Sequence, residues 1–161
     1  MEMYKKELFI GMVLFLLTCL AVFTGGCSTT GDNANGNAGS HASSGTLQVE
    51  KVEILHFHAT RQCYSCITLG DYAEATVNTY FAPEVASGKV VFAHINMDLP
   101  ENKALVEQYG PTGSSLWIGV YTPDGFYKEE DIIVWYRIGN QDEYMTYLKG
   151  VIEKRLAGDL S

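Results

Sequence analysis

In the stretch 51-KVEILHFHATRQCYSCITLG-70, an apolar segment of strand length leads directly into two cysteines. Residues 51–58 are rich in Val, Ile, Leu and Phe, which favours a buried strand. From Cys66 onward, apolar residues recur three or four positions apart, so a helix is predicted over residues 66–81. Cys63 and Cys66 therefore fall between a strand and the start of a helix.

The rest of the chain supplies the other elements of one domain. Apolar runs predict three further strands, which cover residues 89–97, 116–121 and 132–138. Two further helices are predicted from Pro100 to Gly110 and from Asn140 to the C-terminal end, and the turn signal PDG joins the last two strands as an antiparallel pair. The predicted order βαβαββα describes an α/β domain with a central four-stranded mixed sheet flanked by helices.

The position at a helix N-terminus suggests a chemistry for the cysteine pair. Unpaired backbone N–H groups and the helix dipole stabilise an anion there, which favours the thiolate of the first cysteine. The short separation lets the second thiol attack a mixed disulfide formed by the first. We therefore predict Cys63 as the attacking nucleophile and Cys66 as the resolving thiol of a redox-active disulfide, with no other cofactor.

Other uses of the same thiols stay open. Two thiols and an imidazole could hold Cu(I) or Zn(II), and a carrier of Cu(I) or As(III) is the alternative function from the residues themselves. The further candidate ligands are His56, His58, His94 and Met97. We favour redox work and predict no metal site, because His94 falls within a predicted strand, where packing is its expected role. A purely structural disulfide is disfavoured, since so short a loop constrains the unfolded chain little.

The chain resembles the thioredoxin-like superfamily over about residues 48–157, and CxxC after a first strand is the most specific mark. More narrowly, the segments CYSC, DYAEA, FAPEVASGKV and NMDLPEN resemble the exported ArsF family, also described as nitrophenyl-compound nitroreductase subunits. This resemblance implies electron transfer and an association with arsenic-related gene clusters. It adds an electron-donor subunit of a partner reductase as a third possible function.

The resemblance to thioredoxin also assigns residues around the cysteines. His56 aligns with a buried acid that handles protons for the resolving thiol, a task that an imidazole can do at neutral pH. The alternative for His56 is a core histidine hydrogen-bonded to backbone. Ser115 aligns with a cis-proline that closes one wall of the thiol site. We therefore expect Tyr64 and Ser65, between the cysteines, and Ser114 and Ser115 to contact the substrate.

The front of the chain predicts export. A positively charged N-terminus precedes an apolar run over residues 8–23, and small residues and Cys27 follow, as in the lipobox of prokaryotic lipoproteins. We expect a lipoprotein-type signal peptide at 1–26, lipidation of Cys27, a flexible Gly/Asn/Ser tether at 27–47 and the thioredoxin-like domain at 48–161. An uncleaved signal anchor is the alternative. Both place the domain at the outer face of the cytoplasmic membrane.

The net charge of the chain limits the kinds of partner that it is expected to bind. The chain carries 19 acidic and 11 basic residues, a net charge of −8, which argues against binding of nucleic acid or adhesion to anionic headgroups. The expected partners are a protein or small-molecule disulfide substrate and a separate redox protein that recharges the cysteines. The sequence thus predicts an exported, membrane-tethered thiol-disulfide oxidoreductase.

Overall fold

The computed structural model of the protein describes residues 47–161. The predicted signal peptide, the lipidation site Cys27 and the predicted tether up to residue 46 lie outside the described residues. None of the described helices is both long and apolar enough to cross a membrane. The described part thus comprises the predicted domain at 48–161 and the one residue before it.

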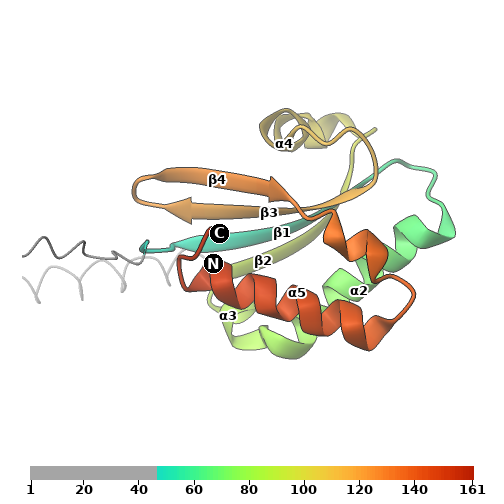
Figure 1. The fold of residues 1–161 in the computed structure, drawn as a ribbon. Helices are drawn as coiled ribbons and strands as arrows, with labels where there is room; N and C mark the ends of the chain where they lie inside the picture. Colours follow the sequence, from blue (N-terminus) through green and yellow to red (C-terminus); the bar gives the residue numbers. More distant parts are fainter. Residues whose placement is uncertain (1–46) are drawn as a thin grey trace, which may run out of the picture. The chain divides into compact units, whose positions relative to one another are not determined.

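A four-stranded mixed sheet forms the centre of the domain (Figure 1). Its strands, in spatial order, are β2 (Val90–Asn96), β1 (Lys51–His58), β3 (Ser115–Thr122) and β4 (Gly125–Glu130). β1 runs parallel to β2 and antiparallel to β3, and β3 runs antiparallel to β4. The central position of β1 explains its apolar sequence, because both of its faces are covered and residues 52–57 are all buried.

Helices cover both faces of the sheet. They are α2 (Tyr64–Tyr80), α3 (Ala82–Ala86), α4 (Lys103–Tyr109) and α5 (Gln141–Leu156), with short 3-10 helices η1 (Pro100–Asn102) and η2 (Ile133–Tyr136). α2, α3 and α5 lie on one side of the sheet, and α4 lies on the other (Figure 1). The predicted α/β order with a four-stranded mixed sheet and flanking helices is therefore confirmed.

Alternation along β1 divides the core into two clusters. Val52 and Ile54 face α2 and α5, where they pack against side chains such as Leu69. Leu55 and Phe57 point to the opposite face and pack with residues of β2 and α4. Because side chains alternate along a strand, His56 must share the face of Val52 and Ile54, beneath α2.

The prediction of the fourth strand at residues 132–138 is wrong. The strand is β4, whose sequence GFYKEE is mostly exposed at the sheet edge and therefore shows no apolar pattern. The pairing with β3 ends where the Asp131 N–H donates to the Leu116 carbonyl at 2.8 Å. The Asp131 carboxylate then accepts from the Ile133 N–H at 3.0 Å, which starts η2. Val134 is the one residue of η2 that is buried, so the apolar run 132–138 mainly covers the surface.

Two helix ends follow the sequence signals. The Asn140 side chain accepts hydrogen bonds from the N–H groups of Asp142 and Glu143, as an N-cap does. Gly110 ends α4 in the left-handed conformation, with φ of 77°. These local signals depend only on neighbours in the chain, which explains why they were predictable.

Candidate active site

Cys63 and Cys66 form a disulfide at the N-terminus of α2, with Cα atoms 5.1 Å apart. Cys63 is the N-cap residue, in an extended conformation with φ of −79° and ψ of 164°. Its Sγ accepts a hydrogen bond from the Cys66 N–H at 3.1 Å, and its carbonyl accepts one from the Ile67 N–H at 3.1 Å. In the reduced protein, the same N–H group would stabilise a Cys63 thiolate.

Exposure differs between the two sulfur-bearing residues. Cys63 is exposed and Cys66 is half-buried. A substrate in solution therefore reaches Cys63 more easily, which favours the predicted roles of Cys63 as attacking thiol and Cys66 as resolving thiol. Those roles stay a prediction. Of the two residues between the cysteines, Tyr64 is open to solvent, with 84% of the residue exposed, and Ser65 is half-buried.

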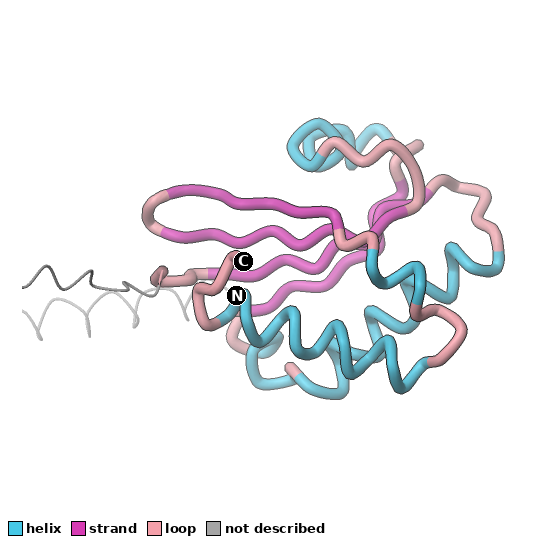
Figure 2. Tube along the Cα trace, viewed as in Figure 1, coloured by secondary structure: helices cyan, strands magenta, loops and turns pink. Residues whose placement is uncertain are grey.

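The loop that carries the pair is attached to the end of β2. This loop joins β1 to α2 at one end of the sheet (Figure 2). The Thr60 N–H donates to the Asp98 carboxylate at 2.8 Å, and the Asn96 side chain donates to the Thr60 hydroxyl at 3.1 Å. Hydrogen bonds from Thr60, mainly from its N–H, hold the pKa of Asp98 below its ordinary value. The sequence does not predict these contacts, although Asn96 and Asp98 both belong to the segment NMDLPEN.

His56 lies beneath the first turns of α2 and is only 1% exposed. A Cβ atom added to Gly70 would lie 2.2 Å from His56 Nδ1, so the ring fits only because residue 70 has no side chain. Gly70 follows Cys66 by four positions on α2, which places both on the same face of the helix. The His56 ring therefore packs against α2 one turn beyond Cys66.

The polar contacts of the His56 ring are with side chains. Its Nδ1 lies 2.9 Å from Nδ1 of His94, and its Nε2 lies 3.5 Å from the Ser114 hydroxyl. The predicted alternative, a core histidine bonded to backbone, does not describe these contacts. Burial, helped by the charges of His94 and His58, lowers the pKa of His56 to about 4. The imidazole is therefore neutral at neutral pH and able to accept a proton.

The two predicted groove serines differ in position. Ser114 contacts His56, as described above, and is half-buried. Ser115 is opposite Phe57 in the sheet, so its side chain lies on the α4 side, away from α2. Its hydroxyl donates to the Gly113 carbonyl at 3.0 Å and accepts from the Trp117 indole N–H at 3.0 Å. Ser114 is therefore the serine whose side chain reaches the site, and Ser115 can contribute its backbone.

The candidate metal ligands do not gather into one site. Within residues 47–161, no group of three or more His, Cys, Asp or Glu side chains has a geometry that could hold a metal ion. Met97 packs with the Leu55 and Phe57 cluster, on the α4 side of the sheet. His58 Nδ1 is 3.0 Å from the Ala59 carbonyl and must donate to it. The His94 ring packs edge to face against Phe92, with centroids 4.9 Å apart, and 36% of the His94 side chain is exposed.

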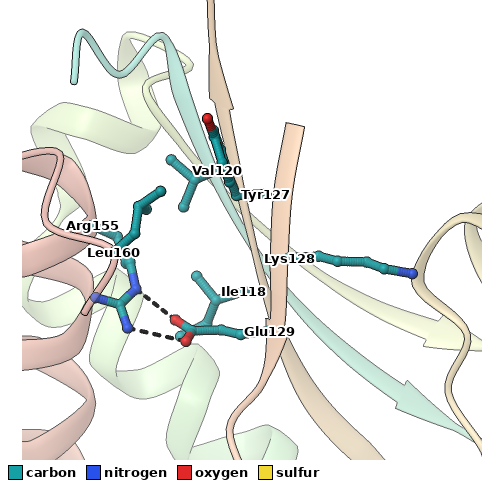
Figure 3. Close-up of a pocket in the computed structure, with 7 residues that line it drawn as sticks. All are labelled: Ile118, Val120, Tyr127, Lys128, Glu129, Arg155 and Leu160. Carbon is teal, nitrogen blue, oxygen red and sulfur yellow. Dashed lines mark hydrogen bonds and ion pairs between the residues drawn. The ribbon is translucent and has the colours of Figure 1, made fainter. Parts of the chain in front are cut away.

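A separate cavity of about 150 Å³ lies between the β3–β4 hairpin and the C-terminal segment (Figure 3). Its apolar wall includes Ile118, Val120 and Leu160. Arg155 closes one side by pairing with Glu129, and Lys128 points away from the other labelled side chains (Figure 3). The cavity contains no thiol and no imidazole, so we assign it no part in the cysteine chemistry.

Comparisons with known proteins concern the fold. No protein-family profile and no curated protein sequence matches the chain. Among solved structures, the Trx4 domain of ERdj5 is 15% identical, with a TM-score of 0.45 over 69% of this chain and 84% of that one. A thioredoxin from Thermus thermophilus is 16% identical, with a TM-score of 0.43 over 65% and 76%. A malarial protein is 15% identical, with a TM-score of 0.41 over 66% and 98%.

The topology described above defines the fold. A βαβ unit with parallel β1 and β2 is followed by an antiparallel β3–β4 hairpin and a C-terminal helix. The cysteine pair lies at the N-terminus of the first helix after the first strand. The chain therefore has a thioredoxin-like α/β fold with a Cys63–Cys66 disulfide at the N-terminus of α2.

Proposed function

We propose that this chain is an exported, membrane-tethered thiol-disulfide oxidoreductase whose Cys63–Cys66 pair cycles between dithiol and disulfide. One observation carries the proposal. The disulfide lies at the N-terminus of α2, Cys63 is an exposed residue, and its Sγ accepts a hydrogen bond from the Cys66 N–H. A structural disulfide needs neither solvent access nor an N–H group directed at one sulfur, whereas a nucleophilic thiolate needs both.

In reduction, the Cys63 thiolate attacks one sulfur of a substrate disulfide. A Cys63–substrate disulfide forms, and the electron pair of the broken bond leaves with the first substrate sulfur, which takes a proton from water. The Cys66 thiol then loses its proton to a base, and its thiolate attacks the Cys63 sulfur. The Cys63–Cys66 bond forms, the second substrate sulfur leaves, and two electrons have passed from the protein to the substrate. Oxidation of a substrate dithiol is the reverse sequence.

A separate redox partner restores the pair after each turnover. The resemblance to ArsF proteins supports a reductase subunit as that partner and a role of this chain as its electron donor. The substrate is a protein or a small molecule with a disulfide. Nucleic acid is not expected as a partner, because the chain carries a net charge of −8.

A redox titration of the full-length protein tests the central proposal. The protein is equilibrated with reduced and oxidised glutathione, and the oxidised fraction of Cys63–Cys66 is measured by alkylation and mass spectrometry. We expect a midpoint within the range of known CxxC proteins, about −270 to −120 mV. A pair that stays reduced in strongly oxidising glutathione, yet binds Cu(I) or As(III) tightly, would replace this function by the soft-metal carrier.

Single substitutions test the roles of the two thiols. Cys66→Ser should accumulate a mixed disulfide through Cys63, because the resolving thiol is gone while the exposed thiol remains. Cys63→Ser is the matched control and should accumulate little. Trapping by Cys63→Ser and not by Cys66→Ser would reverse the assignment and leave the redox function in place.

The membrane tether has its own test. The support comes from the lipobox-like order of residues before Cys27 and from the Gly/Asn/Ser composition that follows. Cys27→Ala should release the protein from membranes or leave it uncleaved, which cell fractionation and gel mobility detect. Unchanged mobility with full membrane retention would instead favour the uncleaved signal anchor.

A further inference from the structure

His94 lies directly opposite His56 in the parallel pairing of β1 with β2. The two rings meet edge to face, with centroids 5.1 Å apart, and their Nδ1 atoms are 2.9 Å apart. His56 is 1% exposed, whereas 36% of the His94 side chain is exposed on β2, an edge strand. The pair therefore connects the space beneath α2 with solvent through one short hydrogen bond.

The neighbouring groups determine where the protons of this pair lie. Each neutral imidazole carries one N–H, so one of the facing Nδ1 atoms donates and the other accepts. His94 Nε2 lies 3.4 Å from the Glu74 carboxylate, which can only accept, so the N–H of His94 is on Nε2. His94 Nδ1 is then the acceptor and His56 Nδ1 the donor. This arrangement leaves the lone pair of His56 on Nε2.

The lone pair on His56 Nε2 is available to accept a proton. Its contact with the Ser114 hydroxyl is 3.5 Å long, the outer limit of a hydrogen bond, so Ser114 occupies it weakly. The ring packs against Gly70, one turn beyond Cys66 on the same face of α2. Residues four apart on a helix are about 5–6 Å from each other, so the imidazole packs against α2 one turn beyond the residue that carries the resolving thiol.

A protonated His56 would be unfavourable if it stayed isolated. The ring is buried, and His58 on the same strand, with its centroid 5.2 Å away, adds a like charge when protonated. His94 offers a better place for the charge, because its ring reaches water and its Nε2 faces Glu74. Transfer of the Nδ1 proton across 2.9 Å moves the positive charge from the buried ring to the exposed one.

We propose that His94 is the outlet of a proton path that begins at Cys66 and passes through His56, with Glu74 positioning the His94 ring. The inference rests on the proposed function and adds the proton transfers of its second step. The Cys66 thiol gives its proton to His56 Nε2, and the Nδ1 proton of His56 passes to His94 Nδ1. The Cys66 thiolate attacks the Cys63 sulfur, and the electron pair of the broken bond leaves with the substrate sulfur. His94, now protonated on both nitrogens, releases one proton to water.

Kinetics of the full-length His94→Ala variant test the path. The reduced protein reacts with the aromatic disulfide 5,5′-dithiobis(2-nitrobenzoate), which releases one coloured thiolate when Cys63 attacks and a second when Cys66 resolves the mixed disulfide. We expect the rate of the first phase to be unchanged and the rate of the second phase to fall about tenfold. A tenfold loss is smaller than the full contribution of general base catalysis, because His56 is still present. Imidazole added to the buffer should restore the second phase, because the vacated position is open to solvent.

His58→Ala is the matched control. Its ring also lies near His56, but its Nδ1 donates to the Ala59 carbonyl, so it is not in the path. The second phase of this variant should be no slower than that of the unchanged protein, because the variant removes only a like charge near His56. A normal second phase in His94→Ala, or a slow one that imidazole does not restore, would overturn the proposal.

A second measurement does not depend on thiol chemistry. Nitrogen-15 spectra of the histidine rings should place the His56 proton on Nδ1 and the His94 proton on Nε2 at neutral pH. The opposite tautomers would overturn the path even if the kinetics agreed. If the unchanged protein shows no second phase, the proposed function fails and the path fails with it. If only the His94→Ala result is contrary, the path alone fails.

Discussion

Gly70→Ala should destabilise the domain, although alanine is the better helix former. The added Cβ would lie 2.2 Å from Nδ1 and 2.5 Å from Cε1 of His56. Carbon atoms normally stay about 3.5–4.0 Å from such neighbours, so the ring or α2 would have to move by more than about 1 Å. Overpacking costs about 1–3 kcal/mol, and this overlap favours the upper end. The higher helix propensity of alanine offsets about 1 kcal/mol of this cost, so the free energy of unfolding should fall by about 2 kcal/mol.

Urea unfolding of the full-length oxidised protein measures this loss. The two tryptophans of the chain, Trp117 and Trp135, lie in the domain and report its unfolding by fluorescence. Gly150→Ala is the matched control, because Gly150 lies within α5 and an added Cβ would meet nothing within 4 Å. That control should gain up to about 1 kcal/mol.

The double variant with His56→Ala isolates the contact. Once the ring is gone, Gly70→Ala should become favourable by about 1 kcal/mol, as in the Gly150 control. The interaction free energy between the two sites is then about 3 kcal/mol. If Gly70→Ala stabilises the protein with His56 present, the packing of His56 beneath α2 is refuted.

Three further predictions concern stability, each measured by urea unfolding. Burial lowers the pKa of His56 from its ordinary 6.5 to about 4, so the unfolded chain binds its proton first. Stability should therefore fall as the pH drops from 6.5 to 4, by up to about 3 kcal/mol, and His56→Gln should remove this part of the dependence. Glu53 is desolvated, but hydrogen bonds from Lys51 and two tyrosines outweigh this and hold its pKa below 4.5. Its share of stability is present above pH 4.5 and lost as the pH falls through the lowered pKa, a loss that Glu53→Gln should not show. Arg155→Met should lower the free energy of unfolding by about 2–4 kcal/mol. The substitution leaves the Asp159 carbonyl and the Glu129 carboxylate, near the cavity of Figure 3, without their hydrogen-bond donor. The exposed pair of Lys149 serves as its control, and Lys149→Met should cost less than about 0.5 kcal/mol. Equal losses for the two would show that the buried position of Arg155 carries no extra stability.

Local signals explain the parts of the fold that were predictable. The apolar strand at residues 51–58, the helix after Cys66 and the cap at Asn140 depend on residues close together in the sequence. The placement of the cysteine pair followed from the first two. The fourth strand was missed because its burial, and hence its pattern, depends on its position at the sheet edge. Residues 132–138 are as apolar as a core strand, yet the Asp131 carboxylate caps a 3-10 turn there.

A thioredoxin-like order of elements, with two cysteines at the start of the first helix, could be predicted from the sequence, and so could the importance of His56. The contacts of His56 could not be predicted, because they depend on how the strands pair. His94 is 38 residues away in the sequence, and the register of β1 against β2 brings the two rings together. The same register, with the pleat of β3, turned the Ser115 side chain away from the site. Register is set by burial on both faces of a sheet at once, and a one-residue shift would move every side chain to the opposite face.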